Sequence, residues 1–136
     1  MKNIVKILMF LVLLILFSCE DFELITCDNC LYEEPSVASL FISISSGPGS
    51  GYFHNIVIYK GKIEDGIVLD SFNTQYAVSR EVSLNTEYTV TASVILDGKT
   101  YVCTDSAIPR TKIYSGCDEI CYYVVDDKVN LNLKYR

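Results

Sequence analysis

The sequence predicts an all-β fold, a single β-sandwich of about seven strands behind an N-terminal signal peptide. From residue 37 onward apolar and polar residues alternate, which is the period of a strand with one buried face. Turn-forming dipeptides separate these runs at intervals of about 8–12 residues, a spacing typical of β-sandwiches. No stretch of the mature chain has the 3.6-residue period of an amphipathic helix.

The alternating runs and the turns between them give the expected strand positions. A Gly-rich loop at 46–51 separates the first two runs. The dipeptides Asp65-Gly66 and Asp97-Gly98 favour hairpin turns, because Asp and Gly both tolerate a positive φ. We expect strands near residues 38–45, 54–60, 66–72, 77–84, 87–96, 99–107 and 128–135.

The first 18 residues have the features of an export signal. Two lysines precede an uninterrupted apolar run, Ile7–Phe17, which as a helix would span about 16 Å, roughly half of a bilayer core. The run is too short for a transmembrane helix and is excluded from the folded domain. Leu16-Phe17-Ser18-Cys19 resembles the bacterial lipobox, which implies cleavage after Ser18 and attachment of acyl chains to Cys19.

We expect the chain to divide into a signal peptide (1–18), an anchored tether (19–36) and a β-sandwich domain (37–136). The acidic segment directly after Cys19, Glu20-Asp21-Phe22-Glu23, is similar to the export signal of surface lipoproteins in Bacteroidota. The resemblance implies an outer-membrane lipoprotein exposed at the cell surface, with a position facing the periplasm as the alternative. As a whole, the chain resembles the short β-sandwich lipoproteins of that group.

The charge of the mature chain limits the classes of partner. Removal of the signal leaves nine basic and seventeen acidic residues, a net charge of −8. Such a surface repels phosphate backbones, and no basic run is present to release counterions from a nucleic acid. No Gly-rich phosphate loop stands between a strand and a helix, so we expect neither nucleic-acid nor nucleotide binding.

One stretch of the sequence carries a resemblance to a known fold. Leu84–Ala92 resembles the corner that leads into the sixth strand of fibronectin type III and related immunoglobulin-like domains, where a leucine precedes a tyrosine by four residues. The resemblance implies that the hydroxyl of Tyr88 bonds to the backbone a few residues upstream. A transthyretin-like sandwich is the alternative, and both families leave function open because such sandwiches carry unrelated activities.

Five cysteines remain once Cys19 carries the lipid, so one of them is expected to be unpaired. If Asp97-Gly98 is a two-residue turn, Ala92 faces Cys103 across the hairpin. Ala92 lies on the apolar side of its strand. We therefore predict that Cys103 points into the core as a buried, inert free thiol.

The other four cysteines form two close pairs, Cys27 with Cys30 and Cys117 with Cys121. Beyond the inner membrane the oxidised form is favoured, so we expect two disulfides that join the tether to the loop before the last strand. Pairing across the clusters is preferred, because it closes long loops and removes the most conformational entropy from the unfolded chain. A four-thiolate zinc site and redox-active or unpaired thiols are the alternatives; we expect no metal and no cofactor.

The residue types of common enzymatic chemistry are sparse. The single histidine, His54, follows the Gly-rich loop without the Gly-x-Ser-x-Gly element of a serine hydrolase, and we expect it to be exposed. Asp118-Glu119 and Asp126-Asp127 lack the alternating spacing of a calcium loop and are interpreted as a solvated acidic edge. We therefore expect no catalytic residues and a protein that is not an enzyme.

Tyrosine is the most frequent aromatic residue, with ten copies, and several of these flank loops. Its ring has an apolar face and a polar hydroxyl, which suits recognition of sugars and proteins. Tyr52, Tyr122 and Tyr123 are the candidate ligand contacts, and ordinary loop packing is the alternative. The expected function is a non-enzymatic, membrane-anchored binding module for an extracellular glycan or protein. The alternative is a structural accessory subunit of an outer-membrane transport or adhesion assembly.

Overall fold

The computed structural model describes residues 27–44, 52–116 and 119–132, which form nine β-strands and two short 3₁₀ turns. The fold is all-β, as the sequence predicts. In this described part, no helix has the length and apolar character needed to cross a membrane. The strands are β1 (Val37–Ile44), β2 (His54–Lys60), β3 (Val68–Thr74), β4 (Val78–Ser83), β5 (Tyr88–Leu96), β6 (Lys99–Ala107), β7 (Arg110–Tyr114), β8 (Cys121–Val125) and β9 (Lys128–Leu131); the 3₁₀ turns are η1 (Cys27–Asn29) and η2 (Ile63–Asp65).

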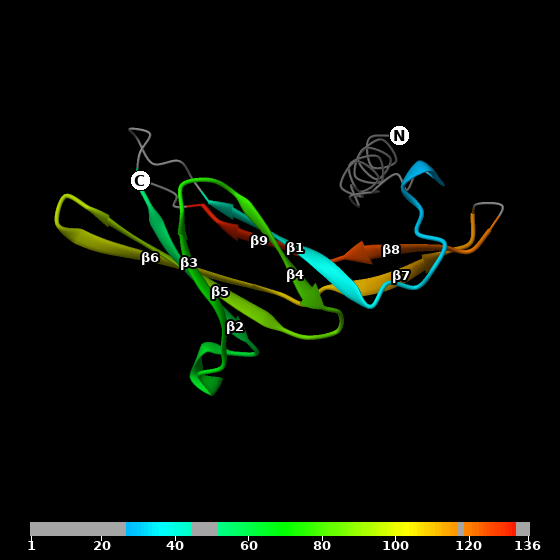
Figure 1. Cartoon of the computed structure of the whole chain (residues 1–136), viewed down its shortest axis with the longest axis horizontal. Helices are drawn as coiled ribbons and strands as arrows, with labels where there is room; N and C mark the ends of the chain where they lie inside the picture. The colour runs from blue at the N-terminus through cyan, green and yellow to red at the C-terminus, as the bar shows by residue number, and fades with distance from the viewer. Residues whose placement is uncertain (1–26, 45–51, 117–118, 133–136) are drawn as a thin grey trace, which may run out of the picture.

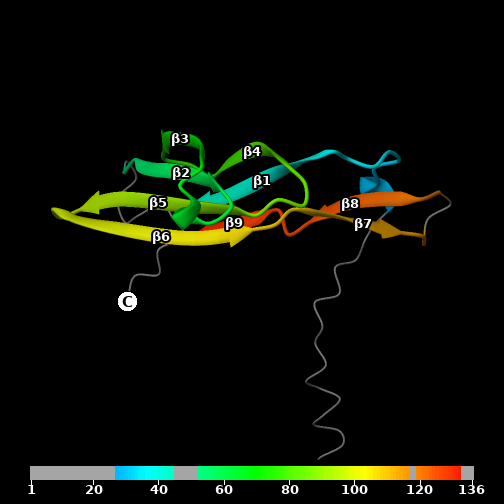
Figure 2. The same cartoon turned by 90° about the horizontal axis from the view of Figure 1, so that it is seen from below.

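Two sheets form a β-sandwich, and a two-stranded extension projects from it (Figures 1 and 2). One sheet has the strand order β4-β1-β9 and the other has the order β3-β2-β5-β6. The extension consists of β7 and β8 and is called the arm. All seven strands expected from the sequence are present, and the arm adds two more.

The core lies between the two sheets and is made by alternate residues of the strands. β1 shows the pattern clearly: Ala38, Leu40 and Ile42 are buried, while the residues between them are exposed. Each fully buried aliphatic side chain contributes on the order of 1.5–3 kcal/mol, so the alternation commits each strand to one face. The core cluster also contains Ile56, Ile58, Val82, Tyr88, Val90, Ala92, Ala107, Val129 and Leu131.

The β5–β6 hairpin has the register expected from its turn. Asp97 and Gly98 have φ angles of 49° and 72°, as a two-residue turn of this hand requires, and Ala92 pairs with Cys103. Cys103 is a free thiol packed against the core. It is half-buried rather than fully buried, because β6 is the edge strand of its sheet.

Tyr88 closes the corner between β4 and β5. Its side chain is buried, and its hydroxyl accepts a hydrogen bond from the Ser83 N–H at 3.0 Å. In the same turn Asn85 has a left-handed φ of 56°, and its N–H donates to the Pro109 carbonyl at 2.7 Å. The Tyr88 contact is the one implied by the likeness to fibronectin type III domains, and the two sheets are compatible with an immunoglobulin-like fold.

The last strand, β9, pairs in parallel with β1, although the two strands lie at opposite ends of the domain sequence. The pairing buries Val129 and Leu131, which fill the core beside Ile42. The sequence predicts this strand over 128–135. The structure has it over Lys128–Leu131, and residues 133–136 lie outside the described part.

Polar contacts link the two sheets along both open sides of the sandwich. On one side, the Asp105 carboxylate on β6 accepts a hydrogen bond from the Asn130 N–H on β9 at 2.8 Å. On the other side, Arg80 on β4 pairs with Asp70 on β3 at 2.9 Å and stacks 4.0 Å from the centre of the Phe72 ring. The side chains of this ion pair are partly exposed, so it fixes geometry more than it adds stability.

The sequence predicts a loop between β6 and β9, and this prediction is wrong. β7 and β8 form an antiparallel pair that leads away from the sandwich and back to β9 (Figure 2). The signal for the arm was the run Tyr122-Tyr123-Val124-Val125, whose aromatic and β-branched residues favour a strand.

The N-terminal segment is tied to the arm. Cys30 and Cys121 form a disulfide, and Leu31 pairs with Tyr122 through two backbone hydrogen bonds of 3.1 and 2.9 Å. The disulfide joins the two cysteine clusters, which is the type of pairing preferred from the sequence. Cys27 is disulfide-bonded as well, while residues 1–26, which include Cys19, and residues 117–118, which include Cys117, lie outside the described part.

Replacement of Tyr88 tests the corner. Tyr88→Phe removes the hydroxyl that accepts the Ser83 N–H, so the free energy of unfolding should fall by about 1 kcal/mol in urea denaturation. Tyr59→Phe is the matched control, because the Tyr59 hydroxyl bonds to no described residue, and it should change stability by less than about 0.5 kcal/mol. Equal effects of the two substitutions would show that the corner hydrogen bond does not stabilise the fold.

Removal of the Cys30–Cys121 bridge tests the tie between the N-terminal segment and the arm. The double variant Cys30→Ala, Cys121→Ala loses a constraint across 91 residues of sequence, and its free energy of unfolding should fall by about 2–4 kcal/mol. Cys103→Ala changes a free thiol and should cost about 1 kcal/mol or less. A double variant as stable as the wild type would contradict a stabilising role for the bridge.

Candidate functional site

The sandwich has two different ends (Figure 1). The arm and the N-terminal segment lie at one end, joined by the Leu31–Tyr122 pairing. The β3–β4 turn, the β5–β6 turn and the start of β2 lie at the other, which is called the loop end. Residues 99–114 of β6 and β7 run from one end toward the other, a length of about 50 Å of extended chain.

Three aromatic side chains are exposed at the loop end. Tyr52 and Phe53 directly precede β2, and Tyr76 lies in the β3–β4 turn; the three are 42%, 64% and 76% exposed. The pairing of His54 with Thr74 brings these two segments to the same edge of the hairpin. Large rings exposed on neighbouring loops of a rigid scaffold are suited to recognition.

Thr74 holds the backbone of Tyr76 in place. The Thr74 hydroxyl accepts a hydrogen bond from the Tyr76 N–H at 3.1 Å and donates one to the Tyr76 carbonyl at 2.9 Å. A turn closed by a side-chain hydroxyl has few alternative conformations. Less conformational entropy is therefore lost when the Tyr76 ring contacts a ligand.

A pair of amide side chains lies next to the rings. Asn55 on β2 faces Asn73 on β3, and Nδ2 of Asn55 donates to Oδ1 of Asn73 at 3.1 Å. Both side chains are exposed, and the arrangement leaves the Asn55 oxygen and the Asn73 amino group available for further hydrogen bonds. Rings beside amides provide a stacking surface together with directed hydrogen bonds, which is what recognition of a sugar or a polar peptide requires.

His54 does not belong to this exposed surface, and the expectation that it is exposed is wrong. The side chain is 3% exposed, because it occupies the first inward-facing position of β2, and its Nδ1 has no hydrogen-bond partner among the described residues. Burial lowers the pKa of His54 below 6.5, and a hydrogen bond with the Thr74 backbone opposes this shift. The ring is uncharged at neutral pH and supports the loop end from within.

The three tyrosines that the sequence singles out do not form one surface. Tyr52 lies at the loop end, whereas Tyr122 and Tyr123 lie half-buried on β8 in the arm. Tyr76 was missed, although an aromatic residue after the short polar stretch Asn73-Thr74-Gln75 was a signal for an exposed ring in a turn. The candidate site therefore keeps Tyr52 and gains residues from β2, β3 and the β3–β4 turn.

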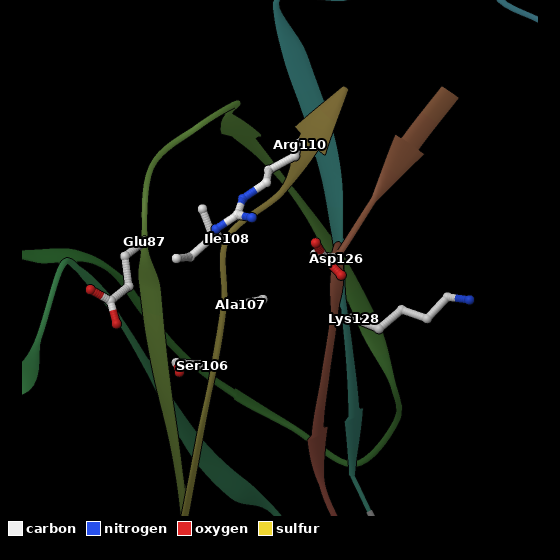
Figure 3. Close-up of a pocket in the computed structure, with 7 residues that line it drawn as sticks. All are labelled: Glu87, Ser106, Ala107, Ile108, Arg110, Asp126 and Lys128. Carbon is white, nitrogen blue, oxygen red and sulfur yellow. The ribbon is translucent and has the colours of Figure 1, made fainter. Parts of the chain in front are cut away.

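A crevice at the junction of the arm and the sandwich is the main alternative site (Figure 3). It has a volume of about 340 Å³, and its lining includes Glu87, Arg110, Asp126 and Lys128. Figure 3 shows that the side chains of Glu87, Arg110 and Lys128 point in different directions and do not converge on one point. Since a ligand site requires polar groups aimed at a common position, we do not assign a site to this crevice.

Among the described residues, no three His, Cys, Asp or Glu side chains lie close enough together to hold a metal ion. Asp126 and Asp127 instead shape the β8–β9 connection. Asp126 has a φ of 55°, and the Asp127 carbonyl accepts a hydrogen bond from the Phe41 N–H at 2.8 Å. The backbone of Asp126 and Asp127 therefore helps to form the connection that pairs β9 with β1.

Comparisons of the chain with protein-family models, with curated proteins and with solved structures gave no match. No function is therefore transferred to this chain from a relative. The functional assignment rests on the geometry and chemistry of its own residues, above all those at the loop end.

The burial of His54 generates a pH dependence of stability. The unfolded chain takes up a proton at His54 near pH 6.5, but the folded chain does so only at lower pH, so folding should weaken as the pH falls below 6.5. Urea unfolding between about pH 8 and pH 5 should show this loss for the wild type and a smaller loss for His54→Gln. Carboxylate titration is common to both proteins and cancels in the difference. If the free energy of unfolding falls with pH equally in the wild type and in His54→Gln, the lowered pKa of His54 is contradicted.

Proposed function

We propose that the chain is a non-enzymatic, lipid-anchored binding module of the bacterial cell envelope, which contacts an extracellular glycan or protein through its loop end. The observation that carries the proposal is the group of exposed rings, Tyr52, Phe53 and Tyr76, at the end opposite the N-terminal segment. Apolar ring surface left in water is unfavourable, and a ligand that covers it removes this cost.

The surface chemistry favours a neutral ligand. The C–H face of a sugar ring can stack on Phe53 or Tyr76, while its hydroxyl groups bond to the Asn55 and Asn73 amides. No basic side chain belongs to the site, and the mature chain carries a net charge of −8. Sulfated or phosphorylated ligands are therefore disfavoured relative to a neutral glycan or a neutral to basic peptide.

The proposed cellular location rests on the N-terminal sequence. The apolar run that ends at Leu16-Phe17-Ser18-Cys19 supports cleavage and lipidation at Cys19, and the acidic residues behind it support surface display of the Bacteroidota type. A module held by acyl chains needs no membrane-spanning segment. The link between Cys30 and Cys121 then holds the arm near the anchor and leaves the loop end farther from it.

A second candidate function is a structural accessory subunit of an outer-membrane transport or adhesion assembly. The observation that favours it is β3, the edge strand of its sheet: Val68 and Leu69 on this strand and Ile67 directly before it are all exposed. An edge strand without lysine or proline offers unpaired backbone groups to a strand of another protein. Lysine substitution at Val68 would block such pairing and leave the loop end unchanged.

Alanine substitution tests the loop end. The mature Cys19→Ala protein is applied to a glycan array and to immobilised extracellular matrix proteins, and the strongest binder is then titrated. The double variant Phe53→Ala, Tyr76→Ala should weaken this binding roughly tenfold or more, because it removes two exposed rings from the contact. Tyr123→Ala, in the arm, is the control and should bind as the unsubstituted protein does. Equal loss in the control would refute the assignment of the site.

Protease treatment of intact cells tests the proposed location at the cell surface. If Cys19 is lipidated and the protein is displayed outward, external protease cleaves the wild type, and Cys19→Ala leaves the membrane fraction. Protection of the wild type until the outer membrane is opened would assign the protein to the periplasm. Retention of Cys19→Ala in the membrane fraction would refute the anchor.

A further inference from the structure

One face of the arm is apolar near its tip. Ile113 on β7 pairs with Tyr122 on β8, and Tyr122 pairs in turn with Leu31, so these three side chains form a row across three neighbouring segments. Ile120 lies directly before β8, two residues from Tyr122. Ile113 is 65% exposed, and Leu31 and Ile120 are exposed as well. These four residues are called the arm patch.

The hydrogen bonding within this row brings the side chains together. The N–H and C=O of Tyr122 bond to Leu31, at 2.9 and 3.1 Å, so the pairing of Tyr122 with Ile113 on the other side is of the non-hydrogen-bonded type. Side chains of such pairs approach more closely than those of hydrogen-bonded pairs. The side chains of Ile113 and Tyr122 are therefore close neighbours, and Leu31, which is hydrogen-bonded to Tyr122, extends the row on the other side.

The opposite face of the arm is different in character. Alternation places Arg110, Lys112 and Tyr114 of β7 on that face, with Tyr123 opposite Lys112. Nearer the sandwich, the face of the arm patch continues to Val124, which packs against the core. The arm patch is thus the part of the core-facing side of the arm that extends beyond the sandwich, with no part of the described chain to cover it.

The position of the anchor limits what can lie against the arm patch. Cys30 lies eleven positions after Cys19, a reach of at most about 40 Å even for fully extended chain. The Cys30–Cys121 disulfide, with a Cα–Cα distance of 5.0 Å, transfers this limit to the start of β8. A lipidated Cys19 therefore keeps the arm patch close to the bilayer surface at a high effective concentration.

We propose that the arm patch docks on the membrane surface beside the lipid anchor, with its isoleucines and tyrosine in the interfacial layer. The proposal rests on the proposed lipidation of Cys19 and adds an orientation to it. Tyrosine and aliphatic side chains are those that partition into this layer. The exposed acids near the patch, Asp28, Glu33, Glu34 and Glu119, disfavour an anionic surface. Docking is therefore expected on zwitterionic lipid and is weakened by anionic lipid.

A single tryptophan tests the proposal, because the chain contains none. The mature lipoprotein with Ile113→Trp is reconstituted into phosphatidylcholine vesicles whose acyl chains carry bromine, a short-range quencher. The matched control is Tyr114→Trp, the next residue of β7, which faces the other side of the arm. Ile113→Trp should show a blue-shifted emission and a strong loss of intensity, and Tyr114→Trp should show neither. Ile120→Trp provides a second reporter if Ile113→Trp does not fold.

Flotation of the vesicles separates the anchor from the docking. Protein that floats with the vesicles but shows equal quenching at Ile113→Trp and Tyr114→Trp keeps its anchor and refutes the docking. Protein that does not float refutes the anchor and the docking together. If Ile113→Trp is shielded from water only in native outer-membrane vesicles and is not quenched in pure lipid, a protein partner covers the arm patch. That result would overturn the proposal. Addition of phosphatidylglycerol should reduce the quenching.

Discussion

The link between the N-terminal segment and the arm determines how the rest of the molecule is presented. It consists of the Cys30–Cys121 disulfide and the paired backbones of Leu31 and Tyr122. Without it, the N-terminal segment would leave the domain at β1, near the middle of the molecule. With it, the chain enters at the tip of the arm, and the long strands place the loop end at the opposite extreme (Figure 1). The proposed anchor at Cys19, upstream of this link, would therefore hold the arm tip near the membrane and the loop end away from it.

The two ends differ in the side chains that they expose, which agrees with the proposed orientation. The loop end presents Tyr52, Phe53 and Tyr76 to solvent on segments fixed by the pairing of β2 with β3. The arm tip presents aliphatic residues and a tyrosine, which suit an interface with lipid rather than a specific ligand. The sandwich between them acts as a spacer whose rigidity comes from its core and from the polar contacts along its two sides.

Local sequence rules predict most of the sandwich. The alternation in β1, β2, β5 and β9 and the Asp97-Gly98 turn depend on neighbouring residues alone, and the register of Ala92 with Cys103 follows from them. The Tyr88 corner could be predicted from the sequence because its hydrogen bond spans only five residues. The parallel pairing of β9 with β1 could not be predicted, because no local sequence pattern specifies which distant strand completes a sheet.

The candidate site was predicted only in part, for related physical reasons. Tyr52 was identified because it flanks a Gly-rich loop, but its neighbour across the hairpin, Tyr76, depends on the pairing of β2 with β3. Tyr122 and Tyr123 were expected in a loop, and the hairpin that contains them became evident only once the arm was seen as two paired strands. His54 was expected to be exposed, but whether its side chain points to solvent or to the core depends on the register of β2. A shift of the strand by one residue exchanges the two faces.

The proposed orientation can be measured as the height of each end of the domain above the membrane. Donor dyes are attached at Lys99→Cys, beside the β5–β6 turn, and at Ser115→Cys, at the arm tip, in a Cys103→Ala background. Energy transfer to acceptor-labelled lipid is then measured for the lipoprotein in vesicles. The proposed orientation predicts strong transfer from position 115 and weak transfer from position 99, because about 50 Å of extended chain separates the two. Equal transfer from both positions, or stronger transfer from position 99, would contradict it.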